Sequence, residues 1–249
     1  MVTLSHQLKN LARTEQFYWF ICHLLSFICF SFSLVESIFG SKLFYKQCLF
    51  FIIVTYVIVL KQIFKQRKDK TKSSKILNDE NLQYFFIAIW FYFSSGKYLE
   101  ILVSFNIFSV FHILNYFQNN LLPHLPLGIQ YQNLINVNIK KVQTNYVYLL
   151  QISLVSEIFL VVSLFSTVVM SILSMNMFKI LWCIITMTFM ILFLNLKVRN
   201  NSLSKQIVTQ LDQVMIQSLA SNYWLNMLSI SSQCLTLYTY VKRIVSLDL

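Results

Sequence analysis

Long apolar runs bounded by charged side chains dominate the pattern along this chain. The first covers residues 16–35, which is about the length that a helix needs to cross the hydrocarbon of a bilayer. Aromatic residues fill its start, where a signal peptide would be aliphatic, so we expect it to be retained. The second run, residues 47–60, is shorter and reaches a full span only if Lys46 extends its ammonium toward the helix end.

Four more runs follow, again in neighbouring pairs. Residues 82–95 and 101–118 are separated by a turn that contains Gly96, Lys97 and Glu100, and residues 146–170 and 180–196 are joined by "SILSMNMFK". The pattern therefore predicts an all-α integral membrane protein with about six hydrophobic helices in three hairpins, followed by C-terminal amphipathic helices.

The character of the chain changes after the sixth run. Apolar residues recur there at helical spacing, with Gln, Lys and Asp on the other face, which predicts an amphipathic helix. Its apolar positions are Leu203, Ile207, Val208, Leu211, Val214, Met215 and Leu219. A second such stretch runs from 223 to 245. Helices of this kind either dock on a membrane bundle or lie in the headgroup plane, and the pattern alone does not choose between the two.

A further helix is expected between the fourth and fifth runs. Pro123, Pro126 and Gly128 end the preceding helix, and a helical pattern resumes at Tyr131 and continues to Asn145, which we interpret as an interfacial helix. The predicted organisation is a first hairpin (1–60), a basic loop (61–81), a short hairpin (82–118), an interfacial segment (119–145), a third hairpin (146–196) and an amphipathic tail (197–249).

Composition and charge agree with a membrane location. Hydrophobic residues make up 57% of the chain and charged residues only 12%, which is typical of a polytopic membrane protein. Most Lys and Arg lie outside the hairpin tips, so the positive-inside rule places both termini and both long loops in the cytosol. The basic loop residues either fix this topology alone or also lie on anionic lipid, and no nucleic-acid partner is expected. These residues are Lys61, Lys65, Arg67, Lys68, Lys70, Lys72 and Lys75.

Side chains that could carry out chemistry are few. The five cysteines are scattered within apolar runs, and no hydrolase, metalloprotease or phosphate-loop motif is present. His23 and His112 have no second ligand within a helical turn, so each is interpreted as a hydrogen-bonding group between helices. We therefore expect no enzyme activity, no catalytic or metal site and no cofactor.

Glu157, inside "SLVSEIFLVV", is the unusual residue, because an ionised carboxylate in hydrocarbon is costly. One interpretation places it at mid-depth, bound to His112 or His23, or protonated and hydrogen-bonded to a Ser or Tyr. The other places it at the cytosolic boundary, paired with Lys140 or Lys141. Both favour a structural role over an ion site, since a lone acid without a relay makes a poor pathway. A small-solute or ion transporter, or a respiratory-membrane accessory subunit, stays as the alternative function.

Four stretches together resemble the pore-and-ER membrane proteins of yeasts, whose animal relative is called transmembrane protein 33. They are "LARTEQFYWFICHLL" (11–25), "FSVFHILNYFQNNL" (108–121), "SEIFLVVSLFSTVVM" (156–170) and "FLNLKVRNNSLSKQIVTQLDQVM" (193–215). The resemblance implies residence in the endoplasmic reticulum and nuclear envelope, association with reticulon-type proteins and, in yeasts, nucleoporins at the pore. The tail after Lys205 is basic only at Lys242 and Arg243, which argues against the importin contact of the yeast pore member.

The hairpins, loops and tail together favour convex bending, because they place more protein in the cytosolic leaflet than in the lumenal one. We therefore expect a protein that shapes or organises curved membrane. The competing hypothesis is a scaffold whose cytosolic surface recruits partners without bending the membrane.

The predicted topology can be tested at Asn200, which forms the glycosylation sequon "NNS" on the side assigned to the cytosol. We expect Asn200 to stay unmodified, as measured by the gel mobility of the protein with and without glycosidase. A glycosidase-sensitive mass shift that is lost in Asn200→Gln would reverse the orientation of the third hairpin.

Overall fold

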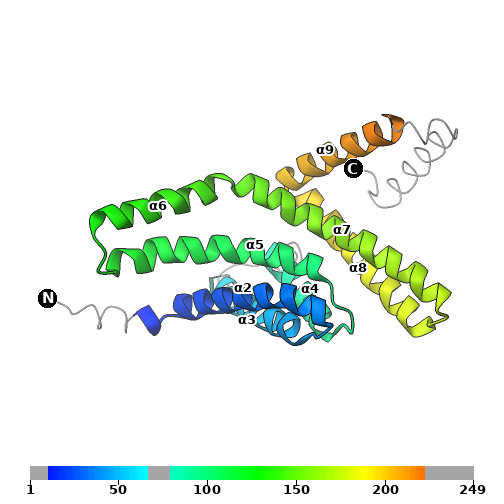
Figure 1. Ribbon diagram of the computed structural model, residues 1–249, viewed down its shortest axis with the longest axis horizontal. Coiled ribbons are helices and arrows are strands. Elements are labelled where there is room, and N and C mark those ends of the chain that lie inside the picture. Colours follow the sequence, from blue (N-terminus) through cyan, green and yellow to red (C-terminus); the bar gives the residue numbers. More distant parts are fainter. Residues whose placement is uncertain (1–10, 67–78, 222–249) are drawn as a thin grey trace. The chain divides into compact units, whose positions relative to one another are not determined.

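The computed structural model describes residues 11–66 and 79–221, and these residues are almost entirely helical (Figure 1). The chain divides into two compact units, Met1–Glu157 and Ile158–Leu249, with the division inside a helix. The prediction of an all-α membrane protein is confirmed, because five helices are long and apolar enough to cross a membrane.

The first unit begins with helices α2 (Glu15–Phe39) and α3 (Leu43–Gln66), which form the first predicted hairpin. Gly40 joins them in the left-handed backbone region, with φ 74°, which a residue with a side chain adopts only at a cost. α3 is longer than the charge-free run 47–60 because it continues past Lys46 at one end and Lys61 at the other.

Helices α4 (Glu80–Phe93) and α5 (Leu99–Tyr116) follow. α4 has 14 residues and is not among the five candidate spans, so only five of the six predicted hydrophobic helices have spanning length. α5 continues through the π-helical turn η3 (Phe117–Leu121) and the short 3-10 helix η4 (Leu122–His124). Helix α6 (Ile129–Thr144), at the predicted interfacial position, and the start of α7 (Tyr146–Leu173) complete this unit.

The second unit holds the rest of α7, helix α8 (Met177–Asn200) and helix α9 (Ser202–Ser221). α9 covers the first predicted amphipathic helix, whereas the second predicted stretch, residues 223–245, lies outside the described residues. Large apolar side chains on α7 and α8 are widely exposed, including Phe159, Phe165 and Leu181, as expected for helix faces in contact with lipid.

Side-chain caps explain why several helices start where they do. The first backbone N–H groups of a helix have no partner within it, so a preceding side chain often accepts one of them. The Oγ1 atom of Thr14 accepts from Phe17 N at the start of α2, and Asp79 Oδ1 accepts from Asn81 N at the start of α4. Asn176 and Asn201 do the same for α8 and α9.

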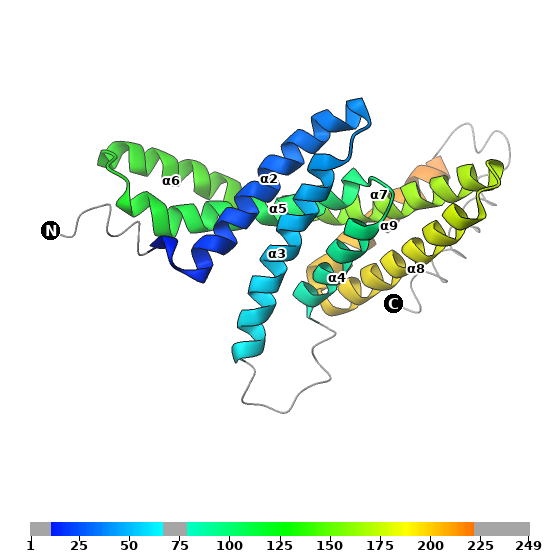
Figure 2. The same cartoon turned by 90° about the horizontal axis from the view of Figure 1, so that it is seen from below.

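The core of the first unit lies among α2, α3, α4 and α5. α3 contacts both α2 and α4, and α5 contacts α2 and α3 (Figure 2). Tyr45, Leu49, Ile87, Phe91 and Leu102 are completely buried there.

A cluster of charges, here called the tip cluster, joins the ends of three of these helices. It consists of Glu36, Lys42, Lys46 and Lys97. Both carboxylate oxygens of Glu36 accept backbone N–H groups at the start of α3, and these donors are Leu43 N (2.6 Å), Phe44 N (3.0 and 3.2 Å) and Tyr45 N (3.2 Å). Glu36 is thus an N-cap supplied by the preceding helix, placed where the helix dipole favours negative charge.

The three lysines of the tip cluster donate to backbone carbonyls at or just after the C-terminal ends of α2 and α4. The Nζ of Lys46 donates to the carbonyls of Phe91, Tyr92 and Ser94 at the C-terminus of α4, and Lys42 donates to Ser95. Lys97 Nζ donates to Ser33 O at 3.3 Å and Ser41 O at 3.2 Å and lies 3.8 Å from Glu36. Cations at helix C-termini are favoured for the same electrostatic reason. The two hairpins are therefore bound to each other at their tips.

We predict that Lys46→Met lowers the stability of the purified protein by about 1–2 kcal/mol, because carbonyls at the end of α4 lose a charged donor. The matched control is Lys179→Met, since Lys179 is exposed at the tip between α7 and α8. Thermal unfolding in detergent measures both variants. Equal midpoints for the two would mean that the tip cluster does not hold α4.

Candidate functional site

A hollow of about 140 Å³ opens within the first unit, among α2, α3, α4 and α5. Six of the residues that line it are buried, namely His23, Ile52, Thr55, Tyr84, Phe105 and Ser109. The other residues that line it are half-exposed, and these are Trp19, Tyr56, Val59, Glu80, Asn81, Phe108 and His112. Its walls are mostly aromatic, so we call it the aromatic hollow.

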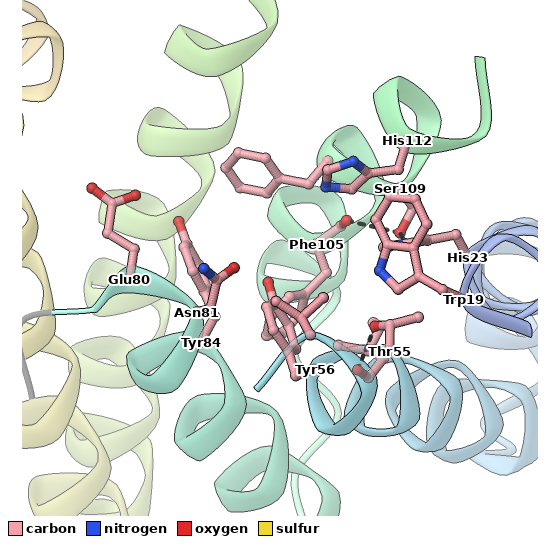
Figure 3. Close-up of a pocket in the computed structure, with 13 residues that line it drawn as sticks. Trp19, His23, Thr55, Tyr56, Glu80, Asn81, Tyr84, Phe105, Ser109 and His112 are labelled. Carbon is pink, nitrogen blue, oxygen red and sulfur yellow. Dashed lines mark hydrogen bonds between the residues drawn. The ribbon is translucent and has the colours of Figure 1, made fainter. Parts of the chain in front are cut away.

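Helix α4 enters the hollow only through its first turns. Glu80 and Asn81 lie at one edge, whereas Trp19, His23 and His112 lie at the opposite edge (Figure 3). The ring of Tyr84 stacks on that of Tyr56, with 6.2 Å between centroids and 8° between planes. Within residues 11–66 and 79–221, no Lys or Arg lines the hollow.

Two histidines that the sequence treats as isolated meet at the edge of the hollow. The ring centroids of His23 and His112 lie 4.8 Å apart. The ring centroid of Trp19 lies 4.7 Å from that of His23 and 4.6 Å from that of His112. His23 Nδ1 lies 2.9 Å from Ser109 Oγ, which links α2 to α5 as expected for a hydrogen-bonding group between helices. Spacing along one helix does not predict this pair, because His23 lies on α2 and His112 on α5.

Trp19 differs from its neighbours in one respect. Its Nε1 atom is inaccessible to solvent, and the residues that the structure describes provide no acceptor for its N–H group. An indole N–H is a donor only, and burial without an acceptor costs free energy.

A buried group of polar side chains also links α2, α3 and α5. Ser26 Oγ donates to Asn106 Oδ1 at 3.3 Å and lies 3.5 Å from Cys48 Sγ, and Asn106 Nδ2 lies 3.5 Å from the same sulfur. The thiol of Cys48 is completely buried, in agreement with its interpretation as a small core residue. Cys22, Cys29 and Cys183 are also free thiols, and Cys234 lies outside the described residues.

Glu157 is completely buried and hydrogen-bonded inside the first unit. Its Oε1 atom accepts from Tyr84 Oη at 2.8 Å and from Ser104 Oγ at 2.5 Å, and Ser104 Oγ lies 2.6 Å from Ser153 Oγ. Of the sequence interpretations, contact with a Ser and a Tyr within the bundle matches this geometry. His112 lies instead against Trp19 and His23, and Lys140 and Lys141 are exposed on α6.

These bonds attach α7 to both helices of the second hairpin. Glu157 reaches α4 through Tyr84 and α5 through Ser104, and Ser156 Oγ donates to Glu100 O at 2.5 Å. A buried carboxylate is tolerated where donors replace its water, so this arrangement can carry a structural role.

The predicted tail helix is only partly buried. Ile207 is 4% exposed, Leu203, Val208 and Leu211 are half-exposed, and Val214 is 61% exposed. The helix therefore neither buries its whole apolar face nor leaves all of it free. The side chains of Met215 and Leu219 lie outside what the structure describes.

Of the basic loop, the structure describes Lys61 and Lys65, both exposed on α3. Lys61 Nζ lies 2.5 Å from Glu15 Oε1, which joins the end of α3 to the start of α2. Arg67, Lys68, Lys70, Lys72 and Lys75 lie outside the described residues.

Comparison with known proteins identifies related sequences. The family model described as Transmembrane protein 33/Nucleoporin POM33 matches residues 4–243, which confirms the resemblance drawn from the sequence. The "Pore and endoplasmic reticulum protein of 33 kDa" of Saccharomyces cerevisiae is 38% identical over 165 residues, 61% of this chain and 59% of that protein. "Nucleoporin POM33" of Chaetomium thermophilum is 34% identical over 134 residues, 50% of this chain and 46% of that protein. The matches thus span about half of the relatives' length, and no solved structure matches this chain.

We predict that Glu157→Gln is tolerated, because the amide oxygen still accepts from Tyr84 and Ser104. Glu157→Leu removes that acceptor and should cost about 1–3 kcal/mol and lower steady-state abundance. Ser166→Leu, on an exposed position of α7, is the control for added apolar volume. Immunoblotting and thermal unfolding measure these effects. Loss of function in Glu157→Gln at normal abundance would show that the charge itself is required.

Proposed function

Since this chain belongs to the transmembrane protein 33/nucleoporin POM33 family, we propose that it is a non-enzymatic protein of the endoplasmic reticulum and nuclear envelope that shapes or organises curved membrane. The names of its relatives refer to the pore and the endoplasmic reticulum, and we extend both locations to this chain. We further propose a role in the distribution or assembly of nuclear pores and in the structure of reticulum tubules. Reticulon-type proteins and nucleoporins are the partners expected from the family.

The observation that carries the membrane-shaping proposal is the length of α4. Its 14 residues extend for about 21 Å, whereas the hydrocarbon core is about 30 Å thick. The tip cluster holds the C-terminal end of α4 beside the ends of α2 and α3, so α4 stops well short of the opposite side of the bundle. A short element of this kind favours local thinning of the bilayer.

Helix α6 supports the asymmetry between leaflets. Ile129, Leu134 and Val137 expose 78%, 59% and 50% of their surface, and Lys140 and Lys141 are exposed beside them. An apolar stripe next to lysines is typical of a helix that lies at the boundary of the hydrocarbon. With the proposed cytosolic orientation, α6 and the tail helix α9 enlarge the cytosolic leaflet, which favours convex bending.

We predict that the purified protein reduces the diameter of liposomes as the protein-to-lipid ratio rises. The double variant Leu211→Asp with Val214→Asp should lose a substantial part of this effect, because charge on the half-exposed apolar face opposes insertion of α9, while the hairpins keep the protein in the membrane. Gln210→Asp with Gln213→Asp adds the same charge to the polar face and serves as the control. Dynamic light scattering and electron microscopy measure the diameters.

An unchanged diameter over a wide protein range would leave only the scaffold hypothesis. If both double variants behave like the unaltered protein, α9 does not contribute to bending. Imaging of the tagged protein at its native level tests the location, since a punctate nuclear rim and a reticular pattern support the proposal and mitochondrial staining contradicts it.

A further inference from the structure

Helix α6 folds back beside the C-terminal end of α5 and is held there by amide side chains (Figure 1). Gln143 Nε2 donates to Gln118 Oε1 at 3.1 Å, and Gln118 Nε2 donates to Asn136 Oδ1 at 3.2 Å. At the start of α7, the ring of Tyr146 lies edge-on to that of Phe111, with 4.8 Å between centroids. These contacts place positions 136–146 of the chain at the level of positions 111–118.

This level coincides with the end of the apolar stretch of α5. Amide side chains, which are costly in hydrocarbon, occur there in close succession, at Asn115, Gln118, Asn119 and Asn120. On the opposite helix, Tyr146 and Tyr148 are 44% and 63% exposed, and tyrosines are enriched where hydrocarbon meets the headgroups. Both features place the junction of α6 and α7 at the headgroup level of one leaflet.

Two adjacent lysines lie at this junction. Lys140 and Lys141 are exposed in the last turns of α6, and neither forms an ion pair within residues 11–66 and 79–221. The sequence contains no Asp or Glu from position 101 to position 156, so no carboxylate of this stretch offsets their charge. Exposed lysines at the headgroup level attract anionic lipids rather than zwitterionic ones.

An exposed apolar strip continues from the lysines along α7. Tyr148, Ile152 and Val155 lie on one face of this helix, at spacings of four and three residues, and are 63%, 36% and 43% exposed. The strip extends for about 10 Å along the helix axis. Cations at the headgroup level followed by an apolar strip match a glycerophospholipid, whose anionic headgroup and acyl chains are arranged in the same order.

We propose that Lys140 and Lys141, together with the apolar strip of α7, bind an anionic phospholipid of the adjacent leaflet in preference to a zwitterionic one. The two ammonium groups contact the headgroup, and one acyl chain lies along the strip. With the proposed orientation this is the cytosolic leaflet, which carries the anionic lipids. The binding depends on the proposed membrane position of α6 but not on membrane bending, so the lipid preference and the change in liposome diameter can fail separately.

Native mass spectrometry of the full-length protein in detergent tests this binding, with phosphatidylserine and phosphatidylcholine of identical acyl chains added in equal amounts. We expect phosphatidylserine to be retained about tenfold better, because each cation near an anionic lipid contributes about fivefold. Lys140→Gln with Lys141→Gln removes both charges and should lower the preference to about twofold or less. Lys140→Arg with Lys141→Arg keeps both charges and should keep the preference.

Lys65→Gln with Lys205→Gln is the matched control, since it removes the same charge from exposed positions on α3 and α9. Size-exclusion profiles and circular dichroism identify variants that remain folded. Equal retention of the two lipids by the unaltered protein, or an equal loss of preference in both glutamine double variants, would overturn the proposal. Displacement of phosphatidylserine by a polyglutamate peptide would also overturn it, because the lysines would then bind an acidic protein segment instead of a lipid.

Discussion

Mutual capping of helix ends within the tip cluster determines much of the first unit. Helix ends carry backbone groups without partners, and hydrocarbon offers no water to satisfy them. Here Glu36, at the end of α2, accepts the first N–H groups of α3, and Lys46, in the first turn of α3, donates to the last carbonyls of α4. Each helix end therefore depends on a side chain from a neighbour. This arrangement sets the position of α4 along the bundle, because its C-terminus cannot slide without losing these donors.

Once its C-terminus is held, the length of α4 decides where its N-terminus lies. Tyr84 is placed within reach of Glu157 on α7, and the first turn of α4 forms an edge of the aromatic hollow. A displaced α4 would separate Tyr84 Oη from Glu157 Oε1 and leave a buried carboxylate with fewer donors, which is costly.

The helices themselves could be predicted from the sequence because apolar runs and turn residues are local signals. The partners of the buried polar residues could not be predicted from the sequence. The sequence presents Lys46 and Lys97 only as charges at hairpin tips. Their acceptors include backbone carbonyls, which every residue carries, so no residue type marks the partner. A Ser and a Tyr were proposed as partners of Glu157, but with 13 tyrosines in the chain the pattern could not select Tyr84. His23 and His112 come together only through the register of α2 against α5, which depends on packing between helices rather than on spacing within one.

Tyr84 connects the two polar features of the first unit. Its hydroxyl donates to Glu157, while its ring forms a wall of the aromatic hollow and stacks on Tyr56. The rings of Phe105 and Phe108 contact it edge-on at 5.7 and 5.6 Å, so its position is restricted from several sides. A tyrosine suits this place because it combines a large apolar face with one polar end. The same side chain that supplies a donor to the intramembrane acid therefore also lines the aromatic hollow, and a change at either feature must be accommodated at the other.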